Sequence, residues 1–212
     1  MLYRADGVGR YRFGKDDELD AGLLLSGYAE VPITGRGVFQ TTYLNDRVSE
    51  YFEHDGFRLI WILREPRAVV YSMLFNWRRG ALRRLYDACG REPREQRPAG
   101  FFGIDADLFR SRLDKACAAY AAKTEQTFEL MERLGPDRLF VVDYNELVLN
   151  KEVMMPKLFE FAGLEFREEF LESLHAGSLR RARWDGDKAE RIDRLCLPVY
   201  ERARAAAGYA VG

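Results

Sequence analysis

The sequence predicts an α/β fold in which a mostly parallel sheet is flanked by helices in three layers. Two apolar stretches are typical of parallel strands buried on both faces: FRLIWIL at residues 57–63 and RLFVVDY at residues 138–144. Segments long enough for helices separate them, and this alternation favours β-α-β units. A length of 212 residues indicates a single domain, which we place over residues 1–212.

The remaining elements follow from periodicity and from turn residues. A further strand is expected within GLLLSGYAEVPI at residues 22–33, followed by an amphipathic helix at residues 41–56. A helix at residues 68–88 should follow the strand at 57–63 directly. The Pro- and Gly-rich stretch at residues 91–103 is interpreted as a surface loop.

The second half of the chain is expected to be mostly helical. Residues 105–135 predict a long helix that ends at Gly135, and residues 151–164 predict a shorter one that ends at Gly163. Pro156 should kink the shorter helix or delay its start. Several apolar residues of the long helix are available for one face: Leu108, Leu113, Cys117, Tyr120, Phe128 and Met131.

Composition and charge exclude several classes of protein. The formal net charge is -1, so the chain as a whole is not drawn to nucleic acid or to an anionic membrane. The three cysteines lack C-x-x-C spacing and the two histidines are not clustered, which argues against a disulfide framework and a metal site. We find no apolar run of membrane-spanning length and no signal peptide, and therefore expect a cytoplasmic protein.

One stretch near the N-terminus imitates a phosphate-binding loop. In GVGRYRFGKDD, residues 7–17, Gly9, Gly14 and Lys15 fit the G-x-x-x-x-G-K spacing. Such a loop follows a buried strand and opens a helix, whereas only the short, polar MLYRAD precedes Gly7. The acidic residues after Lys15 would also repel phosphate, so we interpret the stretch as a polar surface turn.

A better candidate for anion binding follows the strand at residues 57–63. Arg64 ends this strand at the edge of the sheet where parallel sheets bind ligands. Pro66 suits the first turn of the next helix, and Ser72 lies eight residues after Arg64. The guanidinium, the hydroxyl and the helix dipole together would bind a phosphate. The alternative is an Arg64 that caps the sheet edge and a Ser72 that faces solvent.

This stretch resembles the sulfotransferases that use 3′-phosphoadenosine 5′-phosphosulfate (PAPS), whose fold is P-loop-NTPase-like. Their 3′-phosphate segment is an apolar strand, then R-x-P, then a Ser eight residues after the Arg, which Arg64, Pro66 and Ser72 match. Residues 141–166 are similar to the family's strand, Tyr-acid-acid-Leu turn and helix. The resemblance implies that Tyr144 approaches the adenine of PAPS, although Asn145 replaces the usual first acid.

A third segment, residues 177–209, resembles the family's C-terminal basic loop, tryptophan and final helix. The resemblance, which covers about residues 41–209, implies that one of three arginines is a second partner of the 3′-phosphate. The alternative is a solvated basic face. These three arginines are Arg180, Arg181 and Arg183.

The family's phosphosulfate-binding loop, of the K-x-G-T-T or R-S-G-T-T type, does not occur in the sequence. In the family's order it would precede residues 1–30, so we expect the N-terminal βα unit to be missing, through truncation or loss. Charge-assisted hydrogen bonds contribute about 1.5–3 kcal/mol each. The loss of three or four such bonds costs about 6 kcal/mol, on the order of 10⁴-fold in affinity. We therefore expect the isolated chain to bind PAPS weakly and to be nearly inactive.

The catalytic base is not identified by the sequence. Glu30 is a weak candidate, and Arg36 could stabilise the bridging oxygen or could be a turn residue. We reject His54, which precedes the strand at 57–63 and so lies at the opposite end of the sheet. His175 is interpreted as a surface residue.

The predicted function is metal-independent transfer of a sulfuryl group from PAPS to a hydroxyl or amine of a small molecule or glycan. A second hypothesis is a degenerate, non-catalytic binding protein that retains the 3′-phosphate half and could pair with another chain, including a second copy. A third is a nucleotide kinase, for which Asp143 is the one candidate metal ligand at a strand end. Tyr71, Phe75 and Trp77 could line the acceptor pocket or fill the core.

Overall fold

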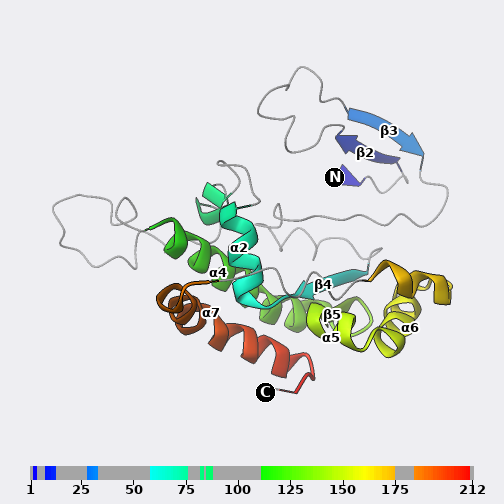
Figure 1. The fold of residues 1–212 in the computed structure, drawn as a ribbon. Helices are drawn as coiled ribbons and strands as arrows, with labels where there is room; N and C mark the ends of the chain where they lie inside the picture. The colour runs from blue at the N-terminus through cyan, green and yellow to red at the C-terminus, as the bar shows by residue number, and fades with distance from the viewer. Residues whose placement is uncertain are drawn as a thin grey trace. The chain divides into compact units, whose positions relative to one another are not determined.

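The computed structural model describes residues 2–3, 8–12, 28–32, 58–75, 82–83, 85–87, 111–174 and 184–210. The chain divides into two compact units, Met1–Thr42 and Tyr43–Gly212 (Figure 1). The second unit begins close to residue 41, where the expected resemblance starts. A single domain over residues 1–212 stays a prediction.

The first unit contains a three-stranded antiparallel sheet of order β1-β2-β3, formed by Leu2–Tyr3, Val8–Arg12 and Tyr28–Pro32. Val8 pairs with Pro32, and Arg12 pairs with Tyr28. The interpretation of this N-terminal stretch as a turn was therefore wrong for residues 8–12. An antiparallel strand can have one solvated face, so alternating arginines do not prevent its formation. The strand expected within residues 22–33 is confirmed as β3, but it is antiparallel.

The second unit contains the parallel pair that the sequence predicts. Strand β4, Leu59–Leu63, pairs with β5, Leu139–Asp143, so that Leu63 lies opposite Asp143. The α/β class is thereby confirmed. In the described part of the chain, however, the parallel sheet has two strands and the antiparallel sheet has three. The mostly parallel, three-layer arrangement is therefore not confirmed.

Helix α2, Pro66–Phe75, follows β4 with Pro66 at its first position, as predicted. Helix α4, Arg112–Leu134, begins at a capping box in which Ser111 and Asp114 bond to each other's backbone N–H. It ends at Gly135, as predicted, where φ is 67°. The other helical elements are α5, Tyr144–Leu149; α6, Lys151–Ala162; η5, a 3₁₀ helix at Glu168–Ser173; and α7, Gly186–Ala206.

Two local expectations in this region need correction. The turn expected at Tyr144 is the short helix α5, because the side chain of Asp143 caps its N-terminus. Of the two alternatives for Pro156, a delayed start is excluded, because α6 begins at Lys151 and contains this proline; the kink stays a prediction. The end of α6 is as predicted: Gly163 has a left-handed φ of 65°, and the Leu164 N–H donates to the Phe159 carbonyl.

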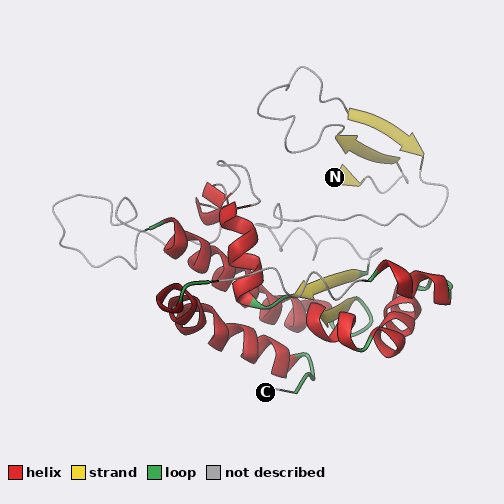
Figure 2. Ribbon diagram, in the orientation of Figure 1, coloured by secondary structure: helices red, strands yellow, loops and turns green. Residues whose placement is uncertain are grey.

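Helices α2, α4 and α7 pack together around the main hydrophobic core of the second unit (Figure 2). The parallel pair is shared between two clusters because its side chains alternate. Trp61 and Leu63 enter the main core, whereas Val142 enters a smaller cluster with Met155. No helix among the described ranges is long and apolar enough to cross a membrane.

The predicted apolar face of the long helix is confirmed where the structure describes it. Cys117 and Tyr120 are buried in the main core. Leu113, Phe128 and Met131 pack against it while remaining partly exposed, and Leu108 lies outside the described residues. The core therefore places the carboxyl ends of β4 and β5 beside the starts of α2 and α5.

Candidate functional site

The carboxyl ends of the parallel pair bring two predicted donor-binding residues together. Leu63 and Asp143 are register partners and end their strands, so Arg64 and Tyr144 are the residues that directly follow β4 and β5. The Arg64 guanidinium carbon lies 4.6 Å from the centroid of the Tyr144 ring, within the range of a cation–π contact. The Tyr120 hydroxyl donates to the Arg64 carbonyl at 2.8 Å. Burial raises the pKa of Tyr120 well above its usual value, so this donor keeps its proton at neutral pH.

The start of α2 differs from the expected anion site. The Glu65 carboxylate accepts from the backbone N–H groups of Arg67 and Ala68 at 2.9 and 2.8 Å. The N-terminus of this helix is one of the groups predicted from the sequence to bind phosphate. Because Glu65 already bonds these two donors, an anion beside Arg64 depends on side chains or must displace this carboxylate.

The other predicted donor contacts are only partly described. Ser72 lies half-buried in α2, and its convergence with Arg64 on one anion stays a prediction. Arg180, Arg181 and Arg183 lie outside the described residues.

Trp184, which directly follows this arginine cluster, is fixed against α2. Its indole N–H donates to the Arg67 carbonyl at 3.0 Å. Its ring centroid lies 5.8 Å from that of Tyr71 and 6.0 Å from that of Phe75. The polypeptide therefore reaches α2 immediately after the arginines.

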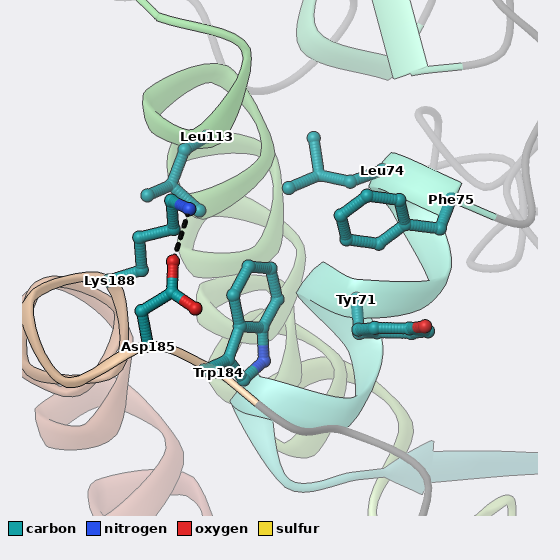
Figure 3. A pocket seen from close by; sticks show the side chains of 7 residues that line it. All are labelled: Tyr71, Leu74, Phe75, Leu113, Trp184, Asp185 and Lys188. Atoms are coloured by element: carbon teal, nitrogen blue, oxygen red, sulfur yellow. Dashed lines mark hydrogen bonds and ion pairs between the residues drawn. The ribbon is translucent and has the colours of Figure 1, made fainter.

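These three aromatic rings also line a small cavity of about 190 Å³ (Figure 3). Leu74 and Leu113 add apolar surface, and an ion pair of 2.5 Å between Asp185 and Lys188 lies at one side. Phe75 is 63% exposed, so of the two alternatives for this residue, filling the core is excluded. Trp77 lies outside the described residues.

A buried polar network is centred on Asp143, the residue before Tyr144. Asp143 is fully buried, and its Oδ1 accepts the backbone N–H groups of Asn145 and Glu146 at 2.9 and 3.0 Å. Its Oδ2 accepts the Tyr200 hydroxyl at 2.6 Å and lies 3.3 Å from Nε of Arg204. Arg204 also donates to Glu146 at 3.0 Å. Burial, then the hydrogen bond to Asp143, raise the pKa of Tyr200, so its hydroxyl remains a donor at neutral pH.

This network bears on the nucleotide-kinase hypothesis, in which Asp143 would be a metal ligand. Both oxygens of Asp143 are bonded within the protein, so it is a structural group rather than an open metal ligand, and the kinase hypothesis loses its candidate residue. Among the described residues, no group of three or more His, Cys, Asp or Glu side chains could hold a metal ion.

Sequence reasoning missed several of these contacts. The cap formed by Asp143 had a signal, because an Asp between a strand and a helix is a frequent N-cap. No signal in the sequence predicted the contact of Cys196 with Cys117. Its thiol donates to the Cys117 carbonyl at 3.7 Å, across a separation of 79 residues. Both cysteines are free and buried.

A comparison with family models matches residues 52–168, more than half of the chain, to a family described as the sulfotransferase family. The chain belongs to this family. The matched part of the chain contains Arg64, Ser72 and Tyr144, and the family resemblance seen in the sequence is thereby confirmed. The three arginines before Trp184 lie beyond the matched range.

Among solved structures, the chain is similar to one titled "Sulfotransferase Domain from the Curacin Biosynthetic Pathway". The two chains share 17% identity, with a TM-score of 0.40. The alignment covers 73% of this chain and 54% of that one, so it spans about half the length of the solved domain. A comparison with curated proteins gives no significant match.

Proposed function

We propose that this sulfotransferase uses PAPS as its donor and transfers the sulfuryl group to a hydroxyl or amine acceptor. The described residues would provide the part that binds the 3′-phosphate and adenine. The observation that carries the proposal is the pairing of Arg64 with Tyr144 at the carboxyl edge of β4 and β5. A guanidinium suits a phosphate, and an adjacent aromatic ring suits a base.

Each predicted residue then has a distinct role. Arg64 directs its planar set of donors toward the 3′-phosphate, and Tyr144 contacts the adenine. Ser72 adds a hydroxyl donor from α2. One of Arg180, Arg181 and Arg183 supplies a second positive charge, which is supported by the attachment of Trp184 to α2.

PAPS supplies the sulfuryl group: the sulfur–oxygen bond to its 5′-phosphate breaks as the acceptor oxygen or nitrogen bonds to sulfur, and the acceptor's proton passes to a base. Glu30 lies on β3 of the first unit, and Arg36 lies outside the described residues, so neither role is assigned. Basic side chains would neutralise the negative charge that develops during the transfer, so the proposed reaction needs no metal ion.

We propose further that the acceptor is a small molecule or a glycan, that the protein is cytoplasmic, and that two copies of the chain associate. The cavity beside Tyr71 and Phe75 would accommodate a small flat group of the acceptor. The non-catalytic alternative is not favoured by the match to the family.

The test is a titration followed by protein NMR up to millimolar ligand, because weak binding is expected. Adenosine 3′,5′-bisphosphate is compared with adenosine 5′-monophosphate, which lacks the 3′-phosphate. We expect the bisphosphate to bind about ten- to a hundred-fold more tightly, the worth of one or more charge-assisted hydrogen bonds. Arg64→Ala should remove most of this preference.

Arg58→Ala is the matched control. Arg58 precedes the other end of β4, and its guanidinium also lies over an aromatic ring, that of Phe161. It should leave the preference for the bisphosphate unchanged. Equal affinities of the wild-type protein for the two nucleotides would refute the proposed donor site.

A further inference from the structure

We infer that the C-terminal helix α7 positions the nucleotide-base contact, through Tyr200 and Arg204 acting on the start of α5. This inference deepens the proposed function and rests on it for the identity of the ligand. The two residues contact Asp143 and Glu146, which lie on either side of Tyr144. They are positioning residues, since they contact Asp143 and Glu146 rather than the proposed nucleotide site.

The position of Tyr144 depends on the start of α5. Tyr144 is the first residue of this helix, so the direction of its side chain depends on how the helix begins. Asp143 fixes this beginning by accepting the N–H groups of the next two residues after Tyr144. A change at Asp143 would therefore turn the first helical turn and the Tyr144 ring with it.

This cap is attached to α7. The Tyr200 hydroxyl donates to Asp143, and the Arg204 guanidinium contacts both Asp143 and Glu146. Arg204 is only 16% exposed and Asp143 is fully buried, so solvent screens these contacts little. Two points of attachment, one before Tyr144 and one after it, hold the turn in one orientation.

The neighbouring backbone of β5 is also held. The Tyr209 hydroxyl, in the segment just after α7, donates to the Val141 carbonyl of β5 at 3.1 Å. The end of β5 is therefore hydrogen-bonded at two residues. Tyr209, after α7, bonds Val141, and Tyr200, on α7, bonds Asp143. These hydrogen bonds join residues that are 57 to 68 positions apart in the sequence. Through them, α7 and the segment after it set the geometry of the contact between Arg64 and Tyr144.

The experiment measures base preference, because a purely structural defect would weaken the binding of all nucleotides alike. Adenosine 3′-monophosphate and uridine 3′-monophosphate share the 3′-phosphate and differ in the base. We expect the wild-type protein to prefer adenine by about ten-fold, as the stacking of a base on an aromatic ring can provide. Arg204→Ala should reduce this preference to about two-fold or less, while binding of the uridine nucleotide changes by less than about three-fold.

Arg202→Ala is the matched control on the same helix. Arg202 is exposed, pairs with Glu125 and lies over the Phe128 ring, away from the start of α5. It should keep the preference for adenine. If Arg204→Ala does not fold, Tyr200→Phe removes a single hydroxyl and should lower the preference by about three-fold.

A readout without ligand separates the two proposals. The Tyr144 ring should shift the NMR signal of the Arg64 Nε–H, and Arg204→Ala should abolish this shift while Arg202→Ala retains it. An unchanged shift together with an unchanged adenine preference in Arg204→Ala overturns the inference. If the wild-type protein binds none of these nucleotides, the proposed function fails, and the Arg64 signal alone decides whether α7 positions the pair.

Discussion

The two ends of the parallel pair carry the same kind of contact and differ in what supports it. At the amino end, the exposed Arg58 lies 5.7 Å from the Phe161 ring and donates to the Phe161 carbonyl. At the carboxyl end, the half-buried Arg64 lies 4.6 Å from the Tyr144 ring. There, a partly buried hydrogen bond from Tyr120 holds the backbone of Arg64, and a buried one from Tyr200 holds the cap before Tyr144.

This difference shows why an arginine over an aromatic ring is not by itself a binding site. The contact at Arg58 is solvated and joins a strand end to a neighbouring helix. The contact at Arg64 rests on a buried network whose groups are fixed before any ligand arrives. Such fixed geometry lowers the cost of ordering side chains when a ligand binds, and it is the feature that favours the carboxyl end as the site.

The largest expected effect comes from removal of Asp143. Asp143→Ala leaves Arg204 without one of its two carboxylates and Tyr200 without its acceptor, both in buried surroundings. The free energy of unfolding should fall by about 3–5 kcal/mol, as measured by urea denaturation. Asp137→Ala, an exposed residue in the turn before β5, should change it by less than about 0.5 kcal/mol. Similar losses for the two variants would remove the contrast between the two ends.

A smaller effect is expected from Tyr200→Phe, which removes one buried hydrogen bond. The free energy of unfolding at pH 7 should fall by about 1–2 kcal/mol. The free energy should also depend on pH. Because the folded protein raises the pKa of Tyr200, this stabilisation is fully present below the unfolded pKa of about 10. It is lost as the pH rises above that value, since the folded state then holds more protons than the unfolded state.

Urea denaturation at pH 8 and at pH 11 measures this difference. The wild-type protein should lose about 1 kcal/mol more per pH unit above pH 10 than Tyr200→Phe does. Parallel losses in the two proteins would show that burial and the hydrogen bond to Asp143 do not hold the proton on the Tyr200 hydroxyl.

The smallest effect should come from Arg58→Ala at the amino end. An exposed cation–π contact contributes about 0.5–1 kcal/mol, and the hydrogen bond to Phe161 lies in solvent. Thermal unfolding should therefore change little, and the free energy of unfolding should fall by less than about 1 kcal/mol. A loss as large as that for Asp143→Ala would mean that the contacts at both ends of the parallel pair stabilise the protein equally.

Expectations that depend on nearby residues were met most often. Within the apolar run at 57–63, Leu59–Leu63 forms β4. Pro66 opens α2, and Gly135 and Gly163 end their helices. Two short elements were misread. Residues 8–12 form a strand although two of the five are arginines, and Tyr144 begins a helix because of the Asp143 cap. Short segments have few residues to establish a period, so pairing partners and caps decide their structure.

The sequence predicted that Arg64 and Tyr144 bind the same donor, through a resemblance to a family that the match over residues 52–168 confirms. The structure brings the two side chains together, and their role in binding stays a prediction. The sequence did not predict that Glu65 would bond the first N–H groups of α2. It assigned Asp143 to a metal in one hypothesis, whereas the folded chain bonds both its oxygens internally. The environment of a carboxylate depends on residues far away in sequence, and for Asp143 these are on α7.

The sequence by itself determined the family, the parallel strands and most of the helix ends, because apolar patterns, capping residues and motif spacing act over a few residues. Only the tertiary structure decided which charged and aromatic groups meet. Tyr200 reaches Asp143 across 57 residues, and Trp184 reaches Arg67 across 117. Contacts of this kind follow from the packing of α7 against the rest of the second unit, and packing is a property of the whole core rather than of any one segment.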